Sequence, residues 1–152
     1  MPRGEMVVKM KESKQQGELA ELNFFTKAYG FGWVVSKPFG DNAKYDFIVD
    51  AGGKLSRVQV KSVTSVQKDS KSGKDSYRPL LCHGSKNKKK YTRHDIDMFA
   101  VFIVGLDVWY LIPINEVNKK RISVYPHRPL SRFSPRDSAK FEKFKSNWDM
   151  FL

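Results

Sequence analysis

The sequence predicts a single domain of the mixed α/β (α+β) class over residues 1–152, with a central mixed β-sheet flanked by helices. A helical pattern lies near the N-terminus, β-rich runs separated by glycine turns fill the middle, and a second helical pattern closes the chain. This order is typical of a sheet packed against helices. With 152 residues, 40% of them hydrophobic, the chain is long enough to bury a core.

The first predicted helix covers about residues 13–29, and Gly30 ends it. At about 100° per residue, its apolar side chains form one broad arc. The arc comprises Leu19, Leu22, Phe24, Phe25, Ala28 and Tyr29. Glu18 and Glu21 fall inside it, where a carboxylate is costly unless a metal or a cation compensates its charge. An interaction of first-turn acids with the helix dipole explains Glu18 equally well, but explains Glu21 less well.

The next elements are predicted strands, which cover residues 32–35, 45–50, 55–63, 98–104 and 108–114. A glycine turn at 51–53 joins the second and third of these runs into a hairpin. A short edge strand is predicted at 122–125 and is ended by Pro126. The closing helix is predicted from residue 134 or 135 to residue 151. Its aromatic side chains share one face at helical spacing, namely Phe141, Phe144, Trp148 and Phe151.

Residues 64–93 form a basic stretch between the two halves of the predicted sheet. Its nine cations against two acids give a net charge of +7, out of +12 for the whole chain. The cations are Lys68, Lys71, Lys74, Arg78, Lys86, Lys88, Lys89, Lys90 and Arg93. We predict a long loop or a loosely held hairpin that contacts a polyanion, because neutralising phosphates releases counterions. For any single lysine, a solvated surface position is an equally good interpretation.

Several classes of protein are disfavoured. No apolar run approaches the ~20 residues needed to span a bilayer, so no membrane partner is expected. The lone cysteine, Cys82, excludes an internal disulfide and a Cys-rich zinc site, and makes the cytoplasm the expected compartment. The three histidines do not have the spacing of metal ligands.

Asp46, Gln59 and Lys61 are the candidate catalytic residues. Residues two apart in a strand share a face, so Gln59 and Lys61 point the same way. The turn at 51–53 folds Asp46 back beside this second strand, so a carboxylate, an amide and an ammonium converge. Polar strand residues ordinarily face water. Here Val58 and Val60 indicate that the other face is buried, so the polar set is expected to line a cleft.

These residues carry a resemblance to a known family. The order Gly17-x-x-x-Glu21, Asp46 and Gln59-x-Lys61 resembles the PD-(D/E)XK nuclease superfamily. More narrowly, it is similar to the small group I intron-associated (homing) endonucleases. The similarity extends to residues 40–46 and 109–113 and, with the closing helix, spans most of residues 14–151. The resemblance implies a restriction-endonuclease-like fold.

The resemblance also implies a function and roles for the residues. The chain would be an endonuclease that hydrolyses phosphodiester bonds of double-stranded DNA at specific sites, with Mg²⁺ as cofactor and Mn²⁺ able to replace it. Asp46, the Gln59 side chain, the Val60 carbonyl and Glu21 or Glu18 would hold the metal, because oxygen ligands suit magnesium. Lys61 would activate water or stabilise charge on the phosphate. Because two strands must be cut, a homodimer or homotetramer is expected.

Gln59 departs from the superfamily pattern, which usually has Glu or Asp at this position. The neutral amide removes one negative charge and is expected to weaken metal binding. Two alternatives therefore stand beside the homing-type nuclease. One is a Holliday-junction resolvase with the same site, and the other is a non-catalytic DNA-binding module that kept the fold.

Overall fold

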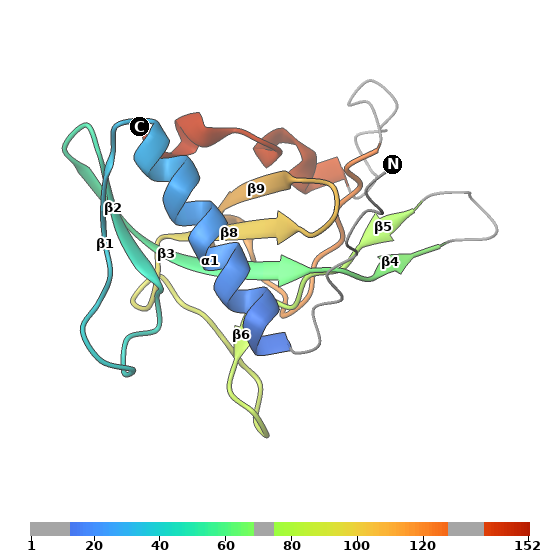
Figure 1. Cartoon of the computed structure of the whole chain (residues 1–152). Coiled ribbons are helices and arrows are strands. Elements are labelled where there is room, and N and C mark those ends of the chain that lie inside the picture. The colour runs from blue at the N-terminus through green and yellow to red at the C-terminus, as the bar shows by residue number, and fades with distance from the viewer. Residues whose placement is uncertain (1–12, 69–74, 128–138) are drawn as a thin grey trace, which may run out of the picture.

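The computed structural model describes residues 13–68, 75–127 and 139–152, and the lead-in at 1–12 lies outside this part. A five-stranded sheet in the order β1-β2-β3-β8-β9 forms its centre, and helix α1 (Ser13–Gly30) crosses one face (Figure 1). The strands are β1 (Val34–Ser36), β2 (Phe47–Ala51), β3 (Lys54–Val63), β8 (Met98–Ile103) and β9 (Val108–Pro113). The first predicted helix and the five main predicted strands are confirmed, with ends shifted by no more than two residues.

The β2–β3 hairpin turns within two residues, because Ala51 already pairs with Lys54. Gly52 and Gly53 both have positive φ, at 64° and 93°. Such a two-residue turn follows the twist of the strands and favours glycine at both positions. β3 then continues past β2 and pairs with β8 in parallel, from Val58↔Met98 to Val63↔Ile103. This parallel pair within an otherwise antiparallel sheet confirms the predicted mixed sheet.

Both faces of the sheet are covered. On the α1 side, Val49, Val58 and Leu111 belong to one buried cluster with Phe24. On the other side, Phe99 and buried residues of the neighbouring strands form a second cluster with Leu81, Ile96 and Val124. Successive residues of β8 and β9 alternate between these clusters, as the two-residue period of a strand requires. None of the helices in the described ranges is long and apolar enough to cross a membrane.

The predicted apolar arc of α1 is wrong in its width. The helix packs on the sheet through a narrow stripe of Ala20, Phe24 and Ala28. The two alanines let the backbone come close, and the Phe24 ring contacts an aromatic group that includes Phe47 at 5.5 Å between ring centres. Leu22 and Tyr29 are instead 61% and 67% exposed. Four of the six residues of the predicted arc are therefore exposed, because Leu19 and Phe25 are each 40% exposed as well.

The predicted closing helix is also wrong. Residues 134–138 lie outside the described part, and two separate 3-10 helices follow, η3 (Ala139–Phe144) and η4 (Trp148–Phe151). Between them the chain pairs with β9. Lys145 bridges Tyr110, and the Ser146 N–H donates to the Trp109 carbonyl at 2.7 Å. This pairing with a distant strand replaces a continuous helix. As a result Phe144 and Phe151 lie in different core clusters rather than on one face.

The basic stretch contains two short hairpins, where one long loop or one loosely held hairpin was predicted. β4 (Val66–Gln67) pairs with β5 (Ser76–Tyr77), and β6 (Cys82–His83) pairs with β7 (Lys89–Lys90). They point in different directions, with β4–β5 at the right and β6–β7 at the bottom of Figure 1. The predicted edge strand at 122–125 is reduced to an isolated bridge between Val124 and Tyr77, beside a second bridge between Arg121 and Leu80.

Candidate active site

The site lies where β2 and β3 separate. Their pairing ends at Phe47↔Val58, so from Gln59 onward no strand of the described part pairs with β3 on that side. Asp46, the residue before β2, occupies this gap. Its N–H donates to the Val58 carbonyl, and its carboxylate accepts from the Val60 N–H, both at 2.8 Å. The predicted return of Asp46 to the middle of β3 is therefore present.

Glu21 approaches the same point from the middle of α1. Its carboxyl group is within hydrogen-bonding reach of the Asp46 carboxyl group. Burial, followed by this hydrogen bond, raises the pKa of Asp46 to about 7, although the hydrogen bond from Val60 acts in the opposite direction. Two carboxylates this close are stable together only when a proton or a cation compensates their charge. The pair thus has the electrostatics of a cation-binding site.

Lys37 is the nearest described cation to Glu21, with 3.6 Å between its Nζ and Oε2 of Glu21. It follows β1, and its Nζ also lies 5.0 Å from the centre of the Phe47 ring. Glu18 lies one helical turn before Glu21, is exposed, and lines the same groove of about 570 Å³ between α1 and β1. Of the two helix acids, the geometry brings Glu21 to Asp46.

Gln59 and Lys61 lie on the sheet face opposite α1, as their spacing predicts. The Gln59 amide Nε2 donates to the Val60 carbonyl at 3.3 Å. The Lys61 Nζ donates to the Cys82 carbonyl at 3.1 Å and lies 5.3 Å from the centre of the Tyr91 ring. Burial lowers the pKa of Lys61, while the negative charge of Asp46 acts against this change.

A metal ion held at this point would have oxygen ligands, which suit hard divalent cations such as magnesium better than zinc. These ligands are the carboxylates of Asp46 and Glu21 and, on β3, the Val60 carbonyl, which accepts from the Gln59 amide Nε2. Within the described ranges, no cluster of three or more His, Cys, Asp or Glu side chains could hold a metal ion. A site of few charges and neutral oxygens suits Mg²⁺, which keeps several of its waters.

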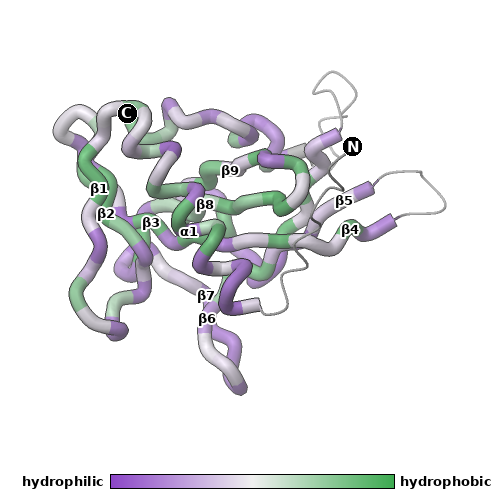
Figure 2. Tube along the Cα trace, in the orientation of Figure 1, coloured by the Kyte–Doolittle hydropathy of each residue, from purple (hydrophilic) through white to green (hydrophobic). Residues whose placement is uncertain are grey.

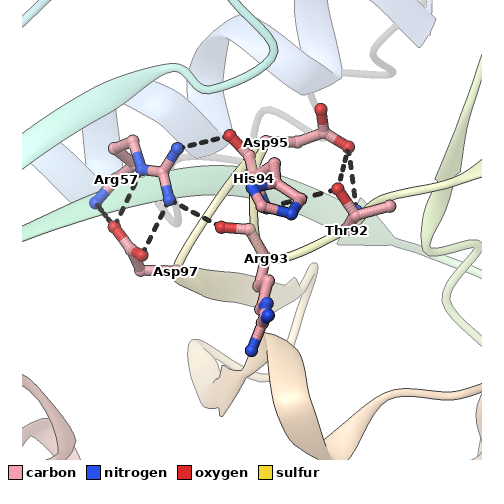
Figure 3. A network of polar contacts seen from close by, with 6 residues as sticks. All are labelled: Arg57, Thr92, Arg93, His94, Asp95 and Asp97. Atoms are coloured by element: carbon pink, nitrogen blue, oxygen red, sulfur yellow. Dashed lines mark hydrogen bonds and ion pairs between the residues drawn. The ribbon is translucent and has the colours of Figure 1, made fainter.

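A polar network that the sequence did not predict holds the segment 92–97 beside the site (Figure 3). Arg57 of β3 binds both carboxylate oxygens of Asp97 at 3.0 Å and donates to the carbonyls of Arg93 and His94. Asp95 accepts from the Thr92 N–H at 2.8 Å and pairs with Lys44 at 3.0 Å. Arg57 and Lys44 are 36 to 51 residues away from their partners in this segment, so no local spacing pattern indicated these contacts.

The candidate DNA-binding residues fall into separate groups. Lys86, Lys88, Lys89 and Lys90 are exposed on the β6–β7 hairpin, whose tip is hydrophilic in Figure 2. This hairpin adjoins the site, because Cys82 at its base contacts Lys61. Arg93 is exposed in the network segment, and Lys68 and Arg78 belong to the β4–β5 region. Lys71 and Lys74 lie outside the described residues.

Comparisons with known proteins identify the family and the fold. A family model described as PD-(D/E)XK endonuclease matches residues 11–144. Among solved structures, the bacterial homing endonuclease I-Ssp6803I is similar with a TM-score of 0.72 and 25% sequence identity, and the match covers 93% of each chain. No match was found among curated proteins. The restriction-endonuclease-like fold implied by the sequence motifs is thereby confirmed.

Proposed function

The chain belongs to the PD-(D/E)XK endonuclease family, and from this premise we propose that it hydrolyses double-stranded DNA with magnesium as cofactor. The observation that carries the proposal is the Asp46–Glu21 carboxylate pair, placed at the open edge of β3 next to Lys61. A half-buried pair of acids beside a half-buried lysine is costly for stability, and such groups gather at functional sites.

Each residue has a role in this proposal. Asp46 and Glu21, with the Gln59 and Val60 oxygens, would hold the magnesium ion. When bound, magnesium lowers the pKa of a water molecule and offsets the charge that builds up on the phosphate. Lys61 would orient the attacking water or donate to a phosphate oxygen. Burial lowers the pKa of Lys61, and the negative charge of Asp46 favours its ammonium form.

The exposed lysines of the β6–β7 hairpin would hold the DNA backbone, since lysine contacts to phosphate position a duplex without reading its sequence. The likeness to a homing endonuclease supports cleavage at specific sites. One chain offers one such site, so cutting both strands would take a homodimer or homotetramer. The cytoplasmic location expected from the lone cysteine stays a prediction.

Plasmid cleavage in Mg²⁺ tests the proposal. Asp46→Ala and Lys61→Ala are expected to lower the cleavage rate at least a thousandfold, while DNA affinity measured in Ca²⁺ changes only a few-fold. Asp149→Ala and Lys27→Ala remove the same charges at exposed positions and should cut at the wild-type rate. Wild-type nicking by both site variants would show that the assignment is wrong.

Gln59 supports one rival, a DNA-binding module without catalysis, because its amide weakens the metal site. That rival predicts no nicking by the wild-type chain at any Mg²⁺ or Mn²⁺ concentration, together with intact DNA binding. A four-way junction as a second substrate tests the resolvase alternative. A resolvase would cut the junction in preference to linear duplex, whatever the sequence of the arms.

A further inference from the structure

The ammonium group of Lys61 is held from one side by the β6–β7 hairpin. Cys82 at the start of the hairpin supplies the carbonyl that accepts from Nζ, and Tyr91 directly after β7 supplies the ring 5.3 Å from it. We propose that the Tyr91 ring is a positioning residue that keeps the Lys61 ammonium directed at the reacting phosphate. This inference rests on the proposed nuclease function.

The Tyr91 ring is itself fixed by its neighbours. It meets the buried Phe99 ring edge to face, with 5.4 Å between ring centres and an angle of 85°. The His83 ring lies 4.7 Å away at 61°. Phe99 pairs with Gln59 in the β3–β8 register, so Tyr91 packs onto the sheet next to the site. A half-buried ring packed in this way presents a constant surface to Lys61.

The chain on either side of Tyr91 is anchored as well. Before it, Cys82↔Lys90 pairing closes the hairpin. After it, the polar network of Figure 3 ties the segment to β3 through Arg57 and Asp97, with 3.0 Å between the charged groups. The Lys44–Asp95 pair ties the same segment to the residues that precede Asp46. Tyr91 is therefore held against the two elements that carry Asp46 and Lys61.

A neutral ring suits this position better than a carboxylate. A lysine ammonium has three N–H donors, and here one is used by the Cys82 carbonyl. An aromatic face attracts the cation without engaging it in an ion pair. Burial raises the pKa of Tyr91 to about 12, so the ring stays uncharged at neutral pH. The remaining donors of Lys61 stay available for water or phosphate.

Single-turnover cleavage of a duplex substrate in Mg²⁺ separates the ring from the hydroxyl group. Tyr91→Leu removes the ring and is expected to lower the cleavage rate about ten- to a hundredfold, with DNA affinity in Ca²⁺ changed less than about threefold. Tyr91→Phe keeps the ring and should restore the rate to within about threefold of wild type. Phe141→Leu is the matched control and should cut at the wild-type rate. It removes a ring that lies 5.3 Å from another ammonium group, the Nζ of Lys140, in η3, which packs against the edge strand β9.

The contact can also be measured without activity. The ε-methylene protons of Lys61, assigned by comparison with Lys61→Arg, should show an upfield ring-current shift in lysine-labelled protein. The shift is expected to persist in Tyr91→Phe and to disappear in Tyr91→Leu. Good dispersion of the other signals in the Tyr91→Leu spectrum shows that this variant is folded.

Three results would overturn the positioning role. They are wild-type cleavage by Tyr91→Leu, an equal loss in Tyr91→Phe and Tyr91→Leu, or a Lys61 signal that does not respond to removal of the ring. A wild-type chain that never cuts DNA overturns the nuclease proposal, and the positioning role falls with it. If the wild-type chain cuts DNA and any of the three results is found, the positioning role of Tyr91 is wrong while the nuclease proposal stands.

Discussion

Asp46 is a half-buried carboxyl group whose hydrogen-bond partner, Glu21, is another acid. Its pKa of about 7 in the folded chain is above the ordinary value of 3.8. The folded state therefore holds this proton more tightly than the unfolded state, and its stability falls as the pH rises from about 4 through about 7. At pH 8 the ionised pair costs on the order of 3 kcal/mol of folding free energy.

Asp46→Asn removes this cost while keeping an acceptor for the Val60 N–H. In EDTA we expect the variant to raise Tm by about 5–10 °C at pH 8 and by much less at pH 5, because the folded wild type is protonated there. Mg²⁺ should raise the Tm of the wild type at pH 8 but not that of the variant. Calorimetry at the two pH values measures both effects. A gain of equal size at both pH values would contradict the raised pKa.

Gln59 is the residue at which the site departs from its family pattern. Gln59→Glu adds a carboxylate beside Asp46 and the Val60 carbonyl, so we expect Mg²⁺ to bind about three- to tenfold more tightly. Titration calorimetry with Mg²⁺ and Mn²⁺ measures the change. Gln67→Glu makes the same substitution at an exposed position of β4 and should leave metal affinity unaltered. Equal affinities for Gln59→Glu and wild type would place this side chain outside the metal shell.

At the scale of elements, the β6–β7 hairpin would link DNA contact to catalysis in the proposed function, since it carries exposed lysines and its Cys82 carbonyl accepts from Lys61. Gly84 in its turn has a φ of 92°, and a Cβ there would lie 2.7 Å from the Asn87 carbonyl oxygen. Gly84→Ala is therefore expected to displace the hairpin and lower the cleavage rate at least tenfold. Gly105 has a similar φ of 89°, but a Cβ there would meet open space. Gly105→Ala should therefore reduce the free energy of unfolding by about 1 kcal/mol and leave the cleavage rate unchanged.

Whether an element is encoded locally or depends on distant residues explains which parts of the structure could be predicted from the sequence. The β2–β3 hairpin is encoded locally by alternation and two glycines, so it was predictable, and with it the return of Asp46 to Val58 and Val60 of β3. The closing helix was not, because pairing of Lys145 and Ser146 with β9 depends on residues more than thirty positions away. Cys82, Tyr91 and the Arg57–Asp97 pair were missed for the same reason. Their contacts arise only after β6 and β8 are placed against β3.

For the whole molecule, the net charge of +12 is distributed unevenly over the surface. The segment 84–90 beside the site contains four lysines and no acid, whereas α1 and η3 combine lysines with acids. Salt should weaken DNA binding in proportion to the phosphates neutralised, with a slope of about −0.9 per contact in log Kobs against log salt. If the duplex lies over Asp46 and Lys61, the charges that determine this slope are the lysines of the β6–β7 hairpin.

Two double variants with equal charge change test where the DNA lies. Lys88→Gln with Lys89→Gln should reduce the magnitude of the salt slope by about 2 and weaken binding at low salt, because two phosphate contacts are lost. Lys27→Gln with Lys143→Gln changes exposed lysines of α1 and η3 and should leave the slope as in the wild type. Fluorescence anisotropy of a labelled duplex in Ca²⁺, over a series of salt concentrations, gives both slopes. If the two double variants lose slope equally, binding depends on the overall charge of the molecule, and the hairpin has no special part in holding the duplex at the site.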